Sequence, residues 1–202
     1  MIRKHDMPFG ADCNADGSVR FRLWAPQSTQ VTLGLLHPAR RELAMNAAGG
    51  GWFELTTVAA GPGSRYQFLV NGGQAVPDPA SRFQPEGVLG PSEVIDPAAY
   101  EWRDEDWRGR SWPEAVIYEL HVGNFTAEGT FAGAEKKLDY LEQLGITAVE
   151  LMPVSSFPGN RNWGYDGVQP FAPASAYGRP EELKHFIDAA HAKNLMVFLD
   201  VV

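Results

Sequence analysis

The sequence contains a single cysteine, Cys13, so no disulfide can form within the chain, and a free thiol suits a reducing compartment. It also has no run of about 18 consecutive apolar residues, the length that a membrane-spanning helix needs, and no signal-peptide pattern near its start. Acidic residues outnumber basic ones, and the formal net charge of -8 repels phosphate backbones and anionic lipids. We therefore expect a cytoplasmic protein that binds neither nucleic acid nor membranes.

Motifs for cofactors and metals are missing as well. The sequence has no phosphate loop, no dinucleotide-binding fingerprint and no short-spaced pair of histidines or cysteines that would bind a metal. It therefore predicts no cofactor and no metal site. Its composition, 44% hydrophobic and 21% charged, is that of an ordinary globular protein with a buried core.

The first half of the sequence has the pattern of short strands. Apolar residues recur at every second position in 19–23, 31–35, 52–55 and 66–70, and glycine-rich turns separate these segments. Such alternation is typical of half-buried antiparallel strands. We expect a small β-sandwich over residues 1–98.

A connector rich in proline and tryptophan follows at residues 99–113. Its three tryptophans are Trp102, Trp107 and Trp112. Large aromatic side chains usually stabilise a protein by being buried, so we expect them to pack between two domains rather than to form a platform for sugars.

Residues 114–202 have a different pattern, in which strands alternate with helices. Strands are expected at 115–122, 146–154 and 195–202, and helices at 130–145 and from Pro180 onward. Thr130 suits the N-cap of the first helix, and Gly145 suits its C-terminal stop. This order predicts a parallel sheet with crossover helices, either in a barrel or in an open sheet.

Each of these three strands carries one carboxylate near its C-terminal end: Glu119, Glu150 and Asp200. Both β/α barrels and open parallel sheets bind ligands at that end. A glycosidase needs two carboxylates that flank the scissile bond, and the spacing alone would allow Glu119 and Asp200, but we do not assign them. A structural role, as hydrogen-bonded groups that hold the loops, is the alternative, and the sequence alone does not decide between them.

The loop after the second strand, residues 155–167, is long, glycine-rich and aromatic. Trp163 and Tyr165 offer flat faces on which a sugar ring can stack, and Asn162 and Asp166 can bond its hydroxyls. This composition favours a carbohydrate site, with packing inside the protein as the alternative.

Four segments of the second half resemble the α-amylase superfamily of glycoside hydrolases. They are Tyr118-Glu119-Leu120-His121-Val122-Gly123, Glu150-Leu151-Met152-Pro153-Val154, Asn162-Trp163-Gly164-Tyr165-Asp166-Gly167-Val168 with Ala176-Tyr177-Gly178, and Leu199-Asp200-Val201-Val202. Within the superfamily, 162–167 and 76–85 are more similar to the members that release trehalose than to branching or debranching members. The resemblance covers nearly the whole chain.

This resemblance implies an immunoglobulin-like β-sandwich followed by the first three β/α units of a TIM-type barrel. It also implies that Tyr165 packs against the sugar at the cleaved linkage, with Trp163 beside it. By the same resemblance, His121, Asn162 and Asp166 line the pocket, whereas Asp200, Glu119 and Glu150 support the site. The family's catalytic carboxylates are expected beyond Val202, so none is assigned within this chain.

The implied substrate is an α-glucan or a maltooligosyl trehalose, cleaved at the α-1,4 bond next to the trehalose end. A branching or debranching enzyme is the second possibility, and a carbohydrate-binding fragment without turnover is the third. Three strands cannot close a barrel, so we also expect the apolar edge at 195–202 to promote self-association.

Overall fold

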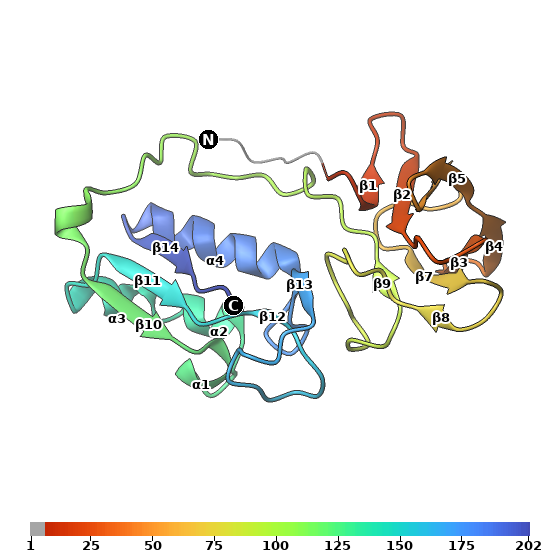
Figure 1. The fold of residues 1–202 in the computed structure, drawn as a ribbon. Coiled ribbons are helices and arrows are strands. Elements are labelled where there is room, and N and C mark those ends of the chain that lie inside the picture. Colours follow the sequence, from red (N-terminus) through yellow and green to blue (C-terminus); the bar gives the residue numbers. More distant parts are fainter. Residues whose placement is uncertain (1–6) are drawn as a thin grey trace. The chain divides into compact units, whose positions relative to one another are not determined.

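The computed structural model describes residues 7–202, which fold into two compact units (Figure 1). The N-terminal unit contains the chain up to Ala99 together with Gln169–Ala172. The barrel unit contains Tyr100–Val168 and Pro173–Val202. Each unit has a hydrophobic core of its own. The boundaries expected at residues 98 and 113 remain predictions.

The N-terminal unit is a sandwich of two antiparallel sheets. One sheet has the order β1-β2-β6-β5, made of β1 (Gly10–Cys13), β2 (Val19–Trp24), β6 (Trp52–Thr57) and β5 (Asn46–Gly49). The other has the order β4-β3-β7-β8, made of β4 (Arg41–Ala44), β3 (Val31–His37), β7 (Arg65–Val70) and β8 (Ala75–Val76), with β9 (Ser92–Glu93) also paired to β7. The immunoglobulin-like sandwich expected from the resemblance is confirmed.

Alternation along the strands builds the core of this sandwich. In β2 the side chains of Val19, Phe21 and Leu23 are buried and those between them are not. The ring of Phe21 lies 4.8 Å from that of Tyr66 in the other sheet, centroid to centroid. The four alternating segments predicted from the sequence are therefore strands. β4 and β5 were not predicted, because they are short strands at the sheet edges with few buried side chains.

A buried polar pair joins the second sheet to the segment after it. The Tyr66 hydroxyl donates to Asp78 Oδ2 at 2.7 Å, and the backbone N–H of Ala80 donates to Asp78 Oδ1 at 2.8 Å. Burial raises the pKa of Asp78 to about 6, although both hydrogen bonds favour the carboxylate. Folding therefore favours the protonated form of this side chain.

This raised pKa predicts a pH-dependent contribution to stability. The pKa of Asp78 is higher in the folded state than in the unfolded state. The contribution of Asp78 to the stability of the fold is therefore fully present below about pH 4 and is lost as the pH rises through about 6. Asp78→Asn removes the titration. The unfolding free energy of the wild type minus that of the variant should fall by roughly 3 kcal/mol between pH 4 and pH 7 in urea titrations. A constant difference across this range would show that Asp78 titrates normally.

The barrel unit contains a parallel sheet in the order β10-β11-β14. Its strands are β10 (Ile117–Leu120), β11 (Ala148–Leu151) and β14 (Met196–Leu199). β12 (Ser155–Ser156) lies at the start of the long loop, and β13 (Gln169–Pro173), which belongs to the N-terminal unit except for Pro173, follows it. The helices are a 3-10 turn at Trp112–Glu114, α1 (Val122–Phe125), α2 (Phe131–Glu135), α3 (Leu138–Gln143) and α4 (Pro180–Ala192). Figure 1 shows α4 running along this sheet. This arrangement is the beginning of a TIM-type barrel, as expected.

The helices follow the predicted signals with one correction. The Thr130 hydroxyl accepts a hydrogen bond from the Gly133 backbone N–H at 3.1 Å and caps α2, and Gly145 has the positive φ of +88° that suits a helix stop. The expected single helix over 130–145 is wrong, because the chain leaves helical geometry between α2 and α3. The apolar stripe is nevertheless buried: Phe131, Ala134, Leu138 and Leu141 are at most 1% exposed.

The three strands of this unit are shorter than predicted. The expected strand at 115–122 ends at Leu120, because the carbonyl of His121 accepts from the N–H groups of Asn124 and Phe125 and the chain turns into α1. The strand expected at 146–154 is confined to β11, and Pro153 has no N–H to extend the ladder. The strand expected at 195–202 is confined to β14.

Two of the connector tryptophans, which belong to the barrel unit, pack on its α4 and β14. The Trp107 ring stacks on His191 of α4 at 4.5 Å, and Trp112 lies 6.2 Å from Phe198 of β14, measured between ring centroids. Trp112 is nevertheless 69% exposed. A role of these tryptophans in joining two domains remains a prediction.

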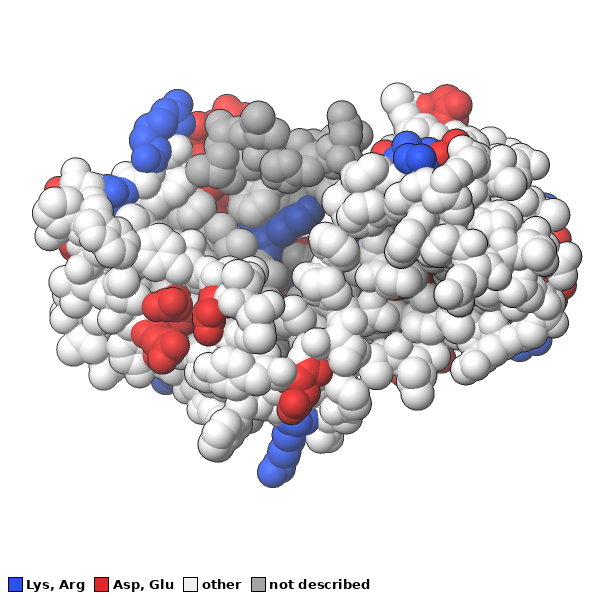
Figure 2. Space-filling model, viewed as in Figure 1, with Lys and Arg blue, Asp and Glu red and all other residues white. Residues whose placement is uncertain are grey.

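Surface charge and hydrophobicity bear on the expected partners. On the face seen in Figure 2, lysines and arginines are scattered and form no continuous patch. Within residues 7–202, no helix is long and apolar enough to cross a membrane. The predictions about nucleic acid, membranes and cytoplasmic location remain predictions.

The open edge of the parallel sheet leads to a further prediction. Leu199, Val201 and Val202 are 51%, 76% and 90% exposed at and beyond the end of β14. Unpaired apolar edges recruit other strands, so the 202-residue chain should self-associate whereas residues 1–98 remain monomeric. Light scattering on both polypeptides measures this. A monodisperse 202-residue monomer that melts cooperatively would contradict the expectation.

Candidate functional site

The three carboxylates noted in the sequence lie near the carboxyl ends of the strands of the parallel sheet. Glu119 and Glu150 are direct partners in the register of β10 and β11, and Asp200 follows the last residue of β14. Leu120 and Leu151 are buried against the helices, so Glu119 and Glu150 lie on the opposite face, which is the inner face of a barrel. The backbone N–H of Asp200 donates to the carbonyl of Leu151 at 2.9 Å, which extends the ladder by one bond.

A second group of predicted residues surrounds a cavity of about 730 Å³ at the carboxyl end of β10. Three of them, His121, Asn162 and Trp163, line it. We call it the His121 cavity. Trp163 is 78% exposed, so its indole face is open to a ligand. The structure therefore brings together residues that lie 41 positions apart in the sequence.

The remaining predicted residues of the loop lie beside this cavity rather than in its lining. Tyr165 is 54% exposed, and Asp166 is exposed as well. The structure does not bring Glu119, Glu150 or Asp200 into the lining. These carboxylates and the His121 cavity are thus separate parts of the same end of the sheet.

A hydrogen-bond chain holds the loop at the His121 cavity. Nε2 of His121 lies 2.5 Å from the carbonyl oxygen of Asn162, so this nitrogen donates to it. The side-chain Oδ1 of Asn162 in turn accepts from the backbone N–H of Gly164 at 2.5 Å. Gly164 directly precedes Tyr165. The loop geometry at Tyr165 therefore depends on a contact with the end of β10.

Gly164 is the tightest point of the loop. Its φ is +105°, and an added Cβ would lie 2.8 Å from Cδ of Pro153. Only glycine meets both requirements without strain. The loop thus turns sharply over Pro153, immediately after β11.

Other lining residues, among them Glu128, Arg161 and Tyr177, were not predicted as site residues from the sequence. Tyr177 is 3% exposed, and its ring meets His121 edge-on at 5.9 Å between centroids. A hydrogen bond from Lys136, 3.0 Å away, lowers the pKa of Glu128. The Ala176-Tyr177-Gly178 segment carried a signal for Tyr177, because it belongs to the resemblance. Nothing in the sequence pattern indicated Glu128.

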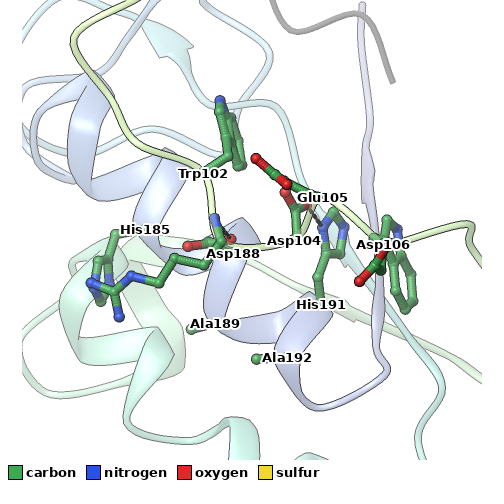
Figure 3. Close-up of a pocket in the computed structure, with 11 residues that line it drawn as sticks. Trp102, Asp104, Glu105, Asp106, His185, Asp188, Ala189, His191 and Ala192 are labelled. Carbon is green, nitrogen blue, oxygen red and sulfur yellow. Dashed lines mark hydrogen bonds and ion pairs between the residues drawn. The ribbon is translucent and has the colours of Figure 1, made fainter.

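Another cavity, of about 500 Å³, lies between the connector and α4 (Figure 3). Figure 3 shows Asp104 and His191 facing one another, and their Oδ2 and Nδ1 atoms are 2.5 Å apart with both side chains almost fully buried. Asp188 accepts a hydrogen bond from the backbone N–H of Arg103 at 3.1 Å. These buried polar groups are hydrogen-bonded to other groups of the same unit, so we interpret this cavity as part of the packing of the connector on α4.

Metal binding has no support among residues 7–202, where no three histidine, cysteine or carboxylate side chains gather as ligands. The structure has the architecture of a β-sandwich followed by the first units of a β/α barrel, with an aromatic loop at the carboxyl ends of the barrel strands.

The comparisons with known proteins specify the family. Residues 94–202 match the family "Alpha amylase, catalytic domain", and residues 8–99 match "Carbohydrate-binding module 48 (Isoamylase N-terminal domain)". The chain belongs to the α-amylase family.

Among its relatives, malto-oligosyltrehalose trehalohydrolase of Deinococcus radiodurans is 47% identical over 183 residues, which are 91% of this chain and 30% of the relative. The enzyme of the same name from Saccharolobus solfataricus is 46% identical over 196 residues, 97% of this chain and 34% of the relative. A crystal structure of a "Putative alpha Amylase" from Salmonella typhimurium is 49% identical with a TM-score of 0.93, covering 98% of this chain and 33% of that one. The chain thus spans about a third of the length of these proteins.

Proposed function

We propose that this chain is the N-terminal part of a malto-oligosyltrehalose trehalohydrolase. The complete enzyme hydrolyses the α-1,4 bond next to the trehalose end of a maltooligosyl trehalose and releases trehalose, a step in trehalose biosynthesis. The catalytic carboxylates come from barrel strands beyond Val202, and cleavage passes through a glycosyl-enzyme intermediate. The chain has a single cysteine, Cys13, and so no internal disulfide, which supports a cytoplasmic location.

The observation that carries this proposal is the loop at the His121 cavity. Trp163 and Tyr165 are both more than half exposed, and they flank Gly164, whose backbone packs closely on Pro153. Exposed aromatic rings on a rigid loop at the carboxyl end of a barrel strand suit sugar stacking. The trehalohydrolase name of the relatives supplies the substrate.

The individual residues then have distinct roles. Tyr165 packs against the sugar at the scissile bond, and Trp163 stacks on a neighbouring unit. Asn162 and Asp166 offer polar groups to hydroxyls at the rim. Asp200 supports the site, and Glu119 and Glu150 shape the inner face of the barrel without transferring protons.

The test compares substrates on the complete enzyme. Initial rates with maltooligosyl trehalose and with glycogen should differ strongly, with trehalose as the product of the first. Activity on glycogen without trehalose release would instead support a branching or debranching enzyme.

A second candidate, glucan binding without turnover, is favoured by a surface of the N-terminal unit. Trp24 is 59% exposed, pairs in register with Trp52 of β6, and donates its indole N–H to the Gly50 carbonyl at 3.1 Å. Both rings border an apolar cavity of about 250 Å³, and the Arg22 guanidinium lies 4.6 Å from the Trp52 ring centroid. A flat, anchored indole beside a charged group is a typical sugar-binding surface.

This candidate predicts that the 202-residue chain binds maltoheptaose and that Trp24→Ala weakens the binding. Loss of one stacking face should lower the affinity about tenfold in calorimetric titrations. Trp112→Ala is the matched control, because Trp112 is 69% exposed but belongs to the barrel unit. Unchanged affinity in Trp24→Ala would exclude this surface.

A further inference from the structure

His121 occupies the end of β10, where the chain turns into α1. It lines the cavity, yet its ring is committed to protein contacts on several sides. Nε2 lies 2.5 Å from the carbonyl of Asn162 and 3.4 Å from the Tyr177 hydroxyl. The Tyr177 ring lies edge-on against the imidazole, with an interplanar angle of 82°. A ring held in this way has little freedom to reach a ligand.

The other ring nitrogen defines the tautomer. Nδ1 is buried and has no hydrogen-bond partner among the described residues. A proton there would lack an acceptor, whereas a proton on Nε2 has the Asn162 carbonyl. On the same side, an added Cβ at Gly123 would lie 3.1 Å from Cε1 of His121, so the backbone of α1 packs closely against the ring. His121 therefore donates from Nε2 toward the loop.

Two hydrogen bonds connect His121 to Gly164, the residue directly before Tyr165. The Asn162 carbonyl is held by His121, and the Asn162 side chain holds the N–H of Gly164 at 2.5 Å. Gly164 packs closely on Pro153, since an added Cβ would lie 2.8 Å from Cδ of that proline. The position of Tyr165 is thus set relative to β10 and β11, the rigid part of the unit.

We propose that His121 is a positioning residue: it places Tyr165 for the sugar at the scissile bond and does not itself bind the sugar. This inference rests on the proposed function. Misplacing a substrate-contacting group by about 1 Å can lower a rate about 100-fold, so an indirect contact of this kind has a measurable effect.

Two substitutions separate the hydrogen bond from the packing. His121→Phe keeps an aromatic ring against Tyr177 and loses the donor, whereas His121→Gln keeps an amide donor near the position of Nε2. In the complete enzyme, His121→Phe should lower kcat at least tenfold with a smaller change in KM, and His121→Gln should restore most of the loss. A loss in His121→Gln as large as that in His121→Phe, or larger, would show that the hydrogen-bond donor does not account for the effect, and would overturn the proposal.

A double-mutant cycle with Tyr165→Ala tests whether His121 influences kcat through Tyr165. If His121 acts through Tyr165, His121→Phe should cost little once Tyr165 is alanine. An undiminished loss in the Tyr165→Ala background would show that His121 contacts the sugar independently, and would contradict the inference.

Hydrogen exchange of the loop distinguishes a failure of this inference from a failure of the proposed function, because it needs no substrate. The Gly164 amide should exchange about tenfold faster in His121→Phe than in the wild type, and His121→Gln should restore protection. If the wild-type enzyme releases no trehalose but this pattern holds, the substrate assignment fails and the positioning role stands. Unchanged exchange in His121→Phe overturns the positioning role, whatever the substrate.

Discussion

The 202-residue chain is expected to release no trehalose above a buffer blank when it is incubated with maltooligosyl trehalose. Glycoside hydrolysis needs two carboxylates that flank the scissile bond. Glu119 and Glu150 are adjacent in the register of neighbouring parallel strands, on one face of one sheet. Glu119 and Glu150 are expected to support the site, and the catalytic pair that flanks the bond is expected beyond Val202, so the 202-residue chain lacks it. Loss of the nucleophile alone lowers glycosidase turnover by several orders of magnitude.

The control for this experiment is the complete enzyme under the same conditions, which shows that the substrate is cleavable. Turnover by the 202-residue chain that Glu119→Gln or Asp200→Asn abolishes would contradict the account. It would place the catalytic carboxylates in this part of the chain.

Gly164→Ala should lower kcat/KM of the complete enzyme about 100-fold, because it moves the loop that carries Trp163 and Tyr165. Both the φ of +105° and the approach to Pro153, where a Cβ would lie 2.8 Å from Cδ, oppose a side chain at this position. Alanine can be accommodated only by a shift of the turn. Steady-state kinetics of the purified variant measure the effect, together with its melting temperature.

Gly159→Ala is the matched control for this substitution. Gly159 belongs to the same loop and has a positive φ of +83°, but a Cβ there would meet nothing within 4 Å. It shares the backbone strain and lacks the collision, so its kcat/KM should change only slightly. Equal losses in the two variants would mean that strain at any glycine of the loop, rather than the position of Tyr165, explains the result.

The fold could be predicted wherever burial imposes a period on the sequence. Phe21 and Phe68 are fully buried at alternating positions of central strands, and Phe186 and Ala190 are fully buried one helical turn apart in α4. The edge strands β4 and β5 could not be predicted, because exposed strands need no apolar period. Strand ends were also overextended, since the turn at His121 depends on backbone hydrogen bonds and not on hydrophobicity.

The residue types of the candidate site could be predicted from the sequence, whereas their arrangement in space could not. Asn162, Trp163 and Tyr165 have side chains suited to sugars, and this property is visible in one short segment. His121 and Asn162 are 41 residues apart in the sequence. Their contact depends on the position of the loop in the folded chain, which a local sequence pattern does not indicate. The buried pair Tyr66 and Asp78 is a similar case, because its members come from separate segments of the N-terminal unit.

A crystal structure of an inactive variant of the complete enzyme with maltotriosyl trehalose bound tests the central claim most directly. The account predicts a sugar ring against Tyr165 and a neighbouring unit in the His121 cavity beside Trp163, with His121 still bonded to Asn162 and not to the ligand. Sugar bound elsewhere, with the His121 cavity empty and Tyr165 free of contact, would contradict it.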